Sequence, residues 1–273
     1  MTSERTPPEP QPSPSALAAR DLLDGLQRWE FWTTMGLQGV RRGYRRSVLG
    51  PLWLTISLAI TVTALSLLYG QLLNVPLERY APHVALGFIA WQFISNAVTR
   101  SCQVFVRHKA WILNARRPLA LFVFEDVWEN FLTMVHNAPV YVVVAILFQV
   151  VAGVAALQVV PGLALVLLNA VWVGLLLGTV CARFRDVAPI VGSVMRVAFF
   201  VTPVIWIPEL LGARAHLALY NPFTYFVELI RAPLLGQAVP AITWMLVLAV
   251  TAAGWTATWF VFARYRSRVA YWL

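Results

Sequence analysis

The feature that most constrains this chain is a long uncharged stretch in its middle. From Asn130 to Ala182 the sequence contains no Asp, Glu, Lys or Arg. A helix needs about 20 apolar residues to cross the hydrocarbon layer of a membrane, which is about 30 Å thick. The stretch is too long for one such helix, and Gly153, Pro161 and Gly162 indicate a turn within it. It therefore predicts two membrane spans, at residues 131–151 and 161–181.

Four further apolar segments have the character of membrane spans. They lie at residues 49–73, 83–99, 187–207 and 240–262. The chain is 59% hydrophobic and 12% charged, whereas soluble domains average about 45–50% and about 25%. We therefore expect an all-α membrane protein with six transmembrane helices. Residues 1–15 are rich in Pro and Ser and are expected to form a disordered tail, which leaves residues 16–273 as the transmembrane domain.

The basic residues predict the orientation of these spans. If the N-terminus is cytoplasmic, the segments on that side hold most of the arginines and Lys109, and the outer segments hold Arg79, Arg214 and Arg231. This distribution follows the positive-inside rule, and six spans return the C-terminus to the cytoplasm. The formal charge of +9 is therefore interpreted as topology, and we expect no nucleic-acid partner. Residues 16–32 are amphipathic and predict an interfacial helix.

The segment between the last two spans, residues 208–239, is too short for two more crossings but far longer than a turn. Asn221 can cap a helix whose first residue is Pro222, where the missing N–H costs nothing. Glu228 and Arg231 are three positions apart and can pair on one helix face. We expect a re-entrant helical hairpin, which membranes tolerate only where the backbone packs on protein or lines a wet cavity.

The sequence lacks the residues that would let it drive transport by itself. A P-loop needs Gly-x4-Gly-Lys-Ser/Thr, but the sole lysine, Lys109, lies in RHKAW with no glycine nearby. The predicted spans contain no carboxylate, the group that proton- and sodium-driven carriers use. The histidines share no metal-ligand spacing, and Cys102 and Cys181 are interpreted as packed thiols. We expect this chain to bind no cofactor or metal and to take its energy from a partner.

Two kinds of side chain in the spans could contact a cargo. Arg196 lies inside the predicted fifth span, where it could bind an anionic head group, or extend to the inner surface if the helix begins later. Aromatic rings could pack on the C–H faces of sugars, although for any single ring a place in the core or in the interfacial belt is the simpler explanation. The aromatic candidates for a substrate channel are Tyr69, Trp91, Phe93, Phe199, Phe200 and Trp206.

Four motifs follow one another along the chain: YRRSVLGPLW at residues 44–53, RFRDV at 183–187, FFVTPVIW at 199–206 and NPFTYFVELIRAPLLG at 221–236. Together they resemble the ABC-2 type permeases that export polysaccharides, including the O-antigen, capsule and teichoic-acid exporters. The resemblance covers nearly the whole chain from about Asp21, and the terminal RVAYWL is similar to the lipopolysaccharide-type branch. It implies a homodimer around a continuous channel in the inner membrane. Two separate nucleotide-binding subunits would dock beneath and hold ATP and magnesium. The implied cargo is a polysaccharide linked to undecaprenyl pyrophosphate.

The resemblance also implies two contact regions. The interfacial helix and the connector after the second span would meet the ATPase, and the coupling candidates are Trp29, Arg107, Lys109, Arg116 and Arg117. The hairpin at residues 208–236 would form a gate on the outer side, with candidates Asn221, Pro222, Phe223, Tyr225, Glu228 and Arg231.

Two other functions remain open. One is an ABC-2 permease for a small amphiphile or drug. The other is a membrane-embedded glycosyltransferase, which would need an acidic cluster at a membrane face. The charged connector at residues 100–129 offers Glu125, Asp126 and Glu129. We expect these three instead to pair with Arg116 and Arg117, or with the ATPase.

Overall fold

The computed structural model describes residues 13–43, 50, 52–115 and 117–273. Most of the predicted disordered tail, at residues 1–12, and most of the YRRSVLGPLW motif lie outside these residues. The described part of the chain is helical and contains no strand. Its elements are, in order, α1 (Pro14–Gln27), α2 (Trp29–Gly43), α3 (Leu52–Leu72), α4 (Leu77–Ser101), α5 (Val104–Arg107), α6 (Lys109–Asn114), α7 (Leu119–Leu147), η1 (Gly153–Gln158), α8 (Val159–Arg183), α9 (Val187–Val201), η2 (Pro208–Tyr220), α10 (Pro222–Leu234) and α11 (Ala241–Trp272).

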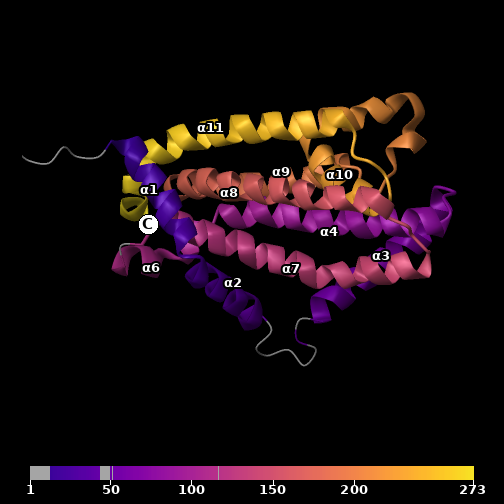
Figure 1. The fold of residues 1–273 in the computed structure, drawn as a ribbon, viewed down its shortest axis with the longest axis horizontal. Coiled ribbons are helices and arrows are strands. Elements are labelled where there is room, and N and C mark those ends of the chain that lie inside the picture. Colours follow the sequence, from indigo (N-terminus) through magenta and orange to yellow (C-terminus); the bar gives the residue numbers. More distant parts are fainter. Residues whose placement is uncertain (1–12, 44–49, 51, 116) are drawn as a thin grey trace, which may run out of the picture.

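The long helices lie side by side in an elongated bundle, as Figure 1 shows for α11, α8, α4 and α7. The short helices α1 and α6 lie at one end, together with the C-terminal end of α11 (Figure 1). We call this the basic end, because it carries Arg100, Arg107, Lys109, Arg183 and Arg266. The segment of η2 and α10, where the sequence predicts a hairpin, lies toward the opposite end (Figure 1), which we call the hairpin end.

Four segments of the described chain are long and apolar enough to cross a membrane. They are Leu52–Leu72, Leu119–Leu147, Gly153–Arg183 and Ala241–Trp272. Large apolar side chains point away from the protein along these helices, including Ile60, Leu68, Ile146 and Phe260. Because such side chains would be costly in water, a lipid surrounding explains their exposure. The prediction of a multi-helix membrane protein is thus supported, while the number of six spans stays a prediction.

Helix α4 lies among its neighbours and contacts α3, α7, α8, α9 and α10. It is as long as a span but more polar than the four apolar helices, with Gln92 and Asn96 along its length. The amide of Asn137 in α7 donates a hydrogen bond to Oε1 of Gln92, at 3.0 Å. Polar side chains that would be costly in lipid thus contact one another between helices. Most of α4 is buried by protein, which explains why it can be less apolar than the outer helices.

Helix α7 begins at Leu119, well before the predicted span at 131–151. The prediction of a connector through Glu129 is therefore wrong. Pro118 precedes the helix, and proline is well suited to a helix start because it lacks an N–H. Glu125, Asp126 and Glu129, which the sequence assigns to the connector, lie within this helix. They are compatible with it because basic side chains of neighbouring elements pair with them.

Helix α9 ends at Val201, whereas the sequence predicted a span to residue 207. The cause is Pro203, whose ring disfavours helical backbone in the preceding residue. Thr202 accordingly has extended dihedral angles, with φ −82° and ψ 137°. A helix of this length covers about 22 Å at about 1.5 Å per residue, which is shorter than the hydrocarbon layer. The chain from Thr202 to Ile207 continues toward the hairpin without helix.

The predicted amphipathic helix at residues 16–32 is two helices. Arg28 leaves the helical region between α1 and α2, with φ −84° and ψ 39°. Helix α2 then packs against α7. A Cβ atom on Gly36 would lie 2.8 Å from the ring of Trp128, so the glycine permits this close approach. The packing of α2 on α7 therefore sets the direction of the second helix, which no local signal at Arg28 indicates.

Candidate functional site

Acidic residues of α7 and basic residues of α4 and α5 form an ion-pair cluster at the basic end. Arg100 contacts Asp126 at 2.9 Å and Glu129 at 2.7 Å. Arg107 reaches the same oxygen of Asp126 at 2.5 Å. The side chain of Asp126 is only 4% exposed, so its charge is compensated by two guanidinium groups rather than by water. We call these four residues the basic-end clamp, because they join the end of α4 and the segment after it to α7.

His108, which lies between α5 and α6, adds a second link to α7. Its Nε2 atom lies 3.2 Å from Oε2 of Glu125, and its Nδ1 atom lies 2.8 Å from the main-chain oxygen of Val104. The imidazole also stacks on Phe122 with ring centroids 4.8 Å apart. Both ring nitrogens therefore lie beside oxygen atoms, one of α7 and one of α5.

The predicted pairing of the three acidic residues with Arg116 and Arg117 is not what the structure shows. Their partners are Arg100, Arg107 and His108, while Arg116 lies outside the described residues. The guanidinium group of Arg117 instead lies over Phe31, 4.3 Å from the ring centroid, and 5.4 Å from the ring centroid of Trp111. This cation–π contact ties the start of α7 to α2 and α6. The acidic residues thus act in structural ion pairs, which weakens the glycosyltransferase alternative.

Asp21 of α1 connects three elements at the basic end. Its carboxylate accepts hydrogen bonds from the main-chain N–H groups of Leu119 and Ala120, at 3.1 and 2.8 Å. It also pairs with Arg266 of α11 at 2.6 Å. The first N–H groups of a helix lack partners within the helix and carry partial positive charge, so a carboxylate from another helix suits this position. Asp21 is 2% exposed, and no local pattern around it indicates this role.

The coupling candidates form a surface at the basic end rather than a single cluster. Trp29 is 58% exposed, and Lys109 donates a hydrogen bond to the main-chain oxygen of Leu273. Between α2 and α6 lies a groove of about 490 Å³ whose walls include Phe31, Arg42 and Trp111. Arg107 and Arg117 turn toward α7 and α2 in the contacts described above. The structure thus places Trp29 and Lys109 where a partner could reach them.

Aromatic residues of α4, α9 and α10 form one connected cluster. Trp91 packs on Phe199 with centroids 5.8 Å apart, and on Phe223 at 5.7 Å. Phe199 also contacts Phe88 at 5.6 Å and Phe200 at 5.3 Å. The structure therefore brings together three predicted channel residues and Phe223, a predicted gate residue. Trp91 is buried, whereas Phe200 at the edge of the cluster is 72% exposed.

The other channel candidates lie outside this aromatic cluster. Tyr69 packs between α3 and α4, and Phe93 is buried beside an apolar pocket. Trp206 donates from its indole N–H to the main-chain oxygen of Phe200, at 3.0 Å. Arg196 is exposed on α9 and donates to the hydroxyl of Ser193 at 2.8 Å. Among the described residues, no carboxylate pairs with Arg196. This fits both interpretations of the residue, as a contact for an anionic head group and as a side chain that extends to the inner surface.

At the hairpin end, side chains of α4 and α10 fasten the stretch that follows α9. Tyr80 donates from its hydroxyl to the main-chain oxygen of Ile205, at 2.7 Å. Arg231 donates through Nη1 to the main-chain oxygen of Pro203, at 2.5 Å, and lies 3.0 Å from Nε2 of His83. The same Nε2 atom also lies 3.3 Å from the main-chain oxygen of Trp206, so the His83 ring contacts both α10 and the stretch after α9. Sequence reasoning missed Tyr80 and His83, whose partners lie far along the chain.

The local predictions for the hairpin are confirmed. The side chain of Asn221 accepts a hydrogen bond from the N–H of Phe223, at 3.0 Å, with Pro222 as the first residue of α10. The amide of Asn221 also donates to the hydroxyl of Thr202, at 2.8 Å. Glu228 pairs with Arg231 at the predicted spacing of three residues. The depth of the hairpin in the membrane stays a prediction.

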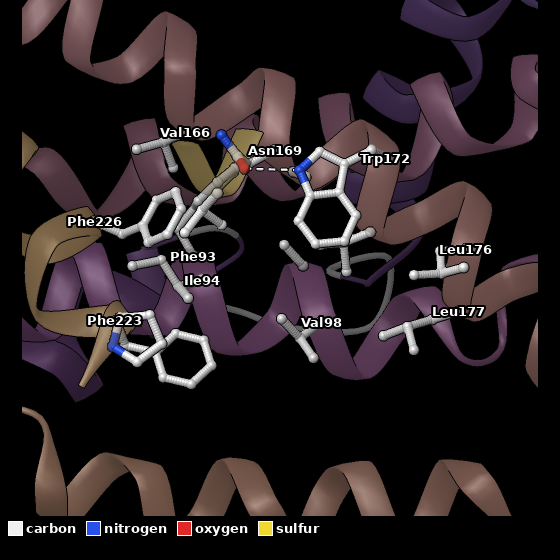
Figure 2. Close-up of a pocket in the computed structure, with 15 residues that line it drawn as sticks. Phe93, Ile94, Val98, Val166, Asn169, Trp172, Leu176, Leu177, Phe223 and Phe226 are labelled. Carbon is white, nitrogen blue, oxygen red and sulfur yellow. Dashed lines mark hydrogen bonds between the residues drawn. The ribbon is translucent and has the colours of Figure 1, made fainter. Parts of the chain in front are cut away.

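An apolar pocket of about 320 Å³ opens between α4, α8, α10 and α11. Figure 2 shows Phe93, Val98, Leu177 and Phe223 among the side chains around it. Its polar groups are Asn169 and the indole N–H of Trp172, which hydrogen-bond to each other at 2.7 Å (Figure 2). The pocket therefore offers hydrocarbon and aromatic surface but no free polar group from these two side chains.

The sequence from residue 31 to residue 235 matches the family described as ABC-2 type transporter. The match covers α2 to α10, and so includes the clamp, the aromatic cluster and the hairpin. The chain belongs to the ABC-2 type transporter family. A search of curated proteins finds no match to it. Family membership and the apolar helices together make this a multi-pass membrane protein and the membrane component of a transporter.

The described residues of this ABC-2 chain were compared with the requirements of metal sites and disulfides. No three His, Cys, Asp or Glu side chains gather there as a group that could hold a metal ion. Cys102 and Cys181 are buried free thiols, as predicted. Proteins of this family typically work in membranes with ATPase subunits.

Proposed function

We propose that this chain is the membrane subunit of an ATP-driven exporter of lipid-linked polysaccharide. Two copies would form the channel in the inner membrane, and two separate ATPase subunits would hold and hydrolyse ATP at the basic end. The cargo would be an O-antigen-like glycan carried on undecaprenyl pyrophosphate. The distribution of basic residues supports an orientation with the basic end in the cytoplasm and the hairpin end outside.

The observation that carries this proposal is the aromatic cluster of α4, α9 and α10. Sugar rings have C–H faces that pack on aromatic planes, and a row of such rings lets a glycan slide without fixed hydrogen bonds. Trp91, Phe199 and Phe200 lead from the body of the bundle to an exposed edge, and Phe223 adds a ring from the hairpin. An aromatic path that ends at the predicted outer gate suits a long neutral polymer.

Coupling to the ATPase would use the exposed part of the basic end. Trp29 and the groove beside Trp111 offer apolar surface, and Lys109 offers positive charge. The basic-end clamp joins this region to α7 and α4. A movement of the ATPase at α6 would therefore be transmitted to the long helices through buried ion pairs rather than through a flexible loop.

Deleting the gene tests the proposal in cells. We expect lipid-linked glycan to accumulate on the cytoplasmic face of the membrane, while its synthesis continues in isolated membranes. A partner ATPase variant that cannot hydrolyse ATP should cause the same accumulation of lipid-linked glycan. If glycan synthesis itself stopped in membranes of the deletion strain, a glycosyltransferase role would replace the exporter role.

A second candidate function is an ABC-2 permease for a small amphiphile or drug, which the pocket in Figure 2 favours. Its apolar walls and volume suit a compact apolar molecule better than a hydroxyl-rich polymer. The two functions differ in one phenotype. Loss of a drug permease changes resistance to the compound and leaves surface glycan unchanged, whereas loss of the polysaccharide exporter removes the surface glycan.

A further inference from the structure

A second cavity, separate from the apolar pocket, lies at the hairpin end. It has a volume of about 530 Å³ and is enclosed by the start of α4, by η2, by α10 and by the beginning of α11. This volume is within the range of about 300–1,000 Å³ that is usual for small-molecule sites. Its walls carry side chains able to donate and accept hydrogen bonds, among them His83, Thr224, Glu228, Gln237 and Thr243.

The charges of this cavity are compensated within the protein. Arg231 pairs with Glu228, and Arg79 lies 3.8 Å from Glu209. Two arginines are thus matched by two carboxylates among the residues that line the cavity. Such a wall favours neither an anion nor a cation. It offers paired charges and amides, which suit a neutral ligand that both donates and accepts hydrogen bonds.

One polar group in the wall has no partner in the described part of the chain. The hydroxyl of Thr224 is buried and makes no hydrogen bond there, and the residue is only 6% exposed. Leaving a buried polar group unpaired costs about 1–3 kcal/mol, so such groups call for an explanation. Thr224 lies on α10 and lines the cavity. The oxygen itself is closed off from the cavity, so a ligand hydroxyl would satisfy it after the Thr224 side chain turns toward the cavity.

Arg231, which lines the cavity, is held in place by several contacts. Arg231 is 2% exposed and bonds to three elements: His83 of α4, the main-chain oxygen of Pro203 after α9, and Glu228 of α10. Tyr225 provides an aromatic wall, and its hydroxyl is already used in a hydrogen bond of 2.7 Å to the main-chain oxygen of Leu219. An aromatic face can pack on one side of a sugar ring, while fixed polar groups beside it bond to the hydroxyl groups at the edge of the ring.

We propose that this cavity is a saccharide-binding site at the outlet of the transporter, for one or two neutral sugar units of the exported chain. The inference rests on the proposed function, because it takes the cargo to be a glycan. Thr224 bonds to a sugar hydroxyl and Tyr225 packs on the ring, while Gln237 lies at the mouth of the cavity. A sugar held there occupies the outlet after it passes the aromatic cluster, which disfavours its return toward the cytoplasm.

Photo-crosslinking in the complete transporter tests this site. The permease and its ATPase are reconstituted in proteoliposomes with radiolabelled lipid-linked glycan, and p-benzoylphenylalanine replaces Gln237, which is exposed at the mouth of the cavity. A second preparation carries the probe at Tyr271, which is 90% exposed at the basic end. We expect ATP-dependent labelling of the permease by glycan at position 237 that exceeds labelling at position 271 at least fivefold.

Removal of the unpaired hydroxyl provides the matched comparison. Thr224→Val keeps the shape of the side chain, and we expect it to lower the crosslink yield at position 237 severalfold. Thr256→Val is the control, because Thr256 is exposed on α11 and its hydroxyl bonds to the main-chain oxygen of Ala252. Both variants are compared at equal amounts of folded protein. A Thr224→Val yield equal to that of Thr256→Val contradicts the assignment of Thr224.

Glycan transport is measured in the same vesicles, so that failure of the saccharide site can be told apart from failure of the exporter function. ATP-dependent transport without preferential labelling at position 237 overturns the saccharide site and leaves the exporter function in place. Absence of ATP-dependent glycan transport in vesicles that hold folded transporter overturns the exporter function itself.

Discussion

Asp21 and Arg266 are 245 positions apart in the chain, and their side chains form an ion pair of 2.6 Å at the basic end of the bundle. The same carboxylate accepts two main-chain N–H groups from the start of α7. One side chain of α1 thus fixes the position of two long helices. The interfacial region is therefore a part of the bundle rather than an appendage of it.

Replacing Asp21 should destabilise the protein. In Asp21→Asn the negative charge is lost, so Arg266 has no counter-charge and one N–H of α7 loses its acceptor. We expect a cost of about 2–4 kcal/mol, since the group is buried. The measurement is the thermal unfolding midpoint of the purified protein in detergent. Asp24→Asn on the exposed side of α1 is the control, and an equal effect of both variants would contradict the assigned role.

The two acidic partners of Arg100 should differ in importance. The side chain of Asp126 is 4% exposed and contacts two arginines, whereas that of Glu129 is 18% exposed and contacts one. Asp126→Asn should therefore lower the unfolding midpoint more than Glu129→Gln, because more buried charge is left without a partner. Thermal unfolding of both variants in one detergent decides the order. The reverse order would show that the clamp is not organised around Asp126.

Loss of Arg231 should be far more damaging than loss of Arg79. Arg231→Ala leaves Glu228, His83 and the main-chain oxygen of Pro203 without their donor, at a cost of about 3–5 kcal/mol. Arg79 and Glu209 form an exposed pair at 3.8 Å, and such pairs contribute little. We expect Arg79→Ala to unfold at nearly the temperature of the unchanged protein. Limited proteolysis at the hairpin should also be faster in Arg231→Ala alone.

Gly87 should tolerate no side chain. A Cβ atom there would lie 2.9 Å from the main-chain oxygen of Val204, in the stretch that Arg231 and Tyr80 hold. Gly87→Ala should cost about 1–3 kcal/mol, because backbone must move to relieve the overlap. Gly192→Ala in α9 meets only Arg196, at 3.9 Å, and should be neutral or gain up to about 1 kcal/mol from helix propensity. Comparable unfolding temperatures for the two variants would contradict this packing.

The elements that sequence could predict are those with local causes. The apolar runs indicate α3, α8 and α11, and Asn221 followed by Pro222 indicates the start of α10. The spacing of Glu228 and Arg231 is enough to predict their pair, because residues three apart share a helix face. The early end of α9 was missed, although Pro203 marks it.

The features that sequence could not predict depend on contacts between distant segments. The charged residues up to Glu129 favoured a connector before the span. Their basic partners lie in α4 and α5, and no local sequence pattern reveals those contacts. The break at Arg28 follows from the packing of α2 on α7, and nothing in the residues around Arg28 marks it. The contact of His83 with Arg231 and the position of Thr224 in the cavity depend on the packing of α10 against the start of α4. Neither residue forms a motif with its neighbours in sequence, so local pattern could not predict these roles.

The central claim, that this permease exports glycan with energy from a partner ATPase, is tested most directly by a transport assay in sealed vesicles. The permease and ATPase are inserted so that the basic end faces outward, and labelled lipid-linked glycan and ATP are supplied outside. Glycan that becomes protected from an added glycosidase has been transported. The account predicts protection that requires ATP, the permease and an active ATPase together. Equal protection without ATP, or with a catalytically inactive ATPase, would contradict it.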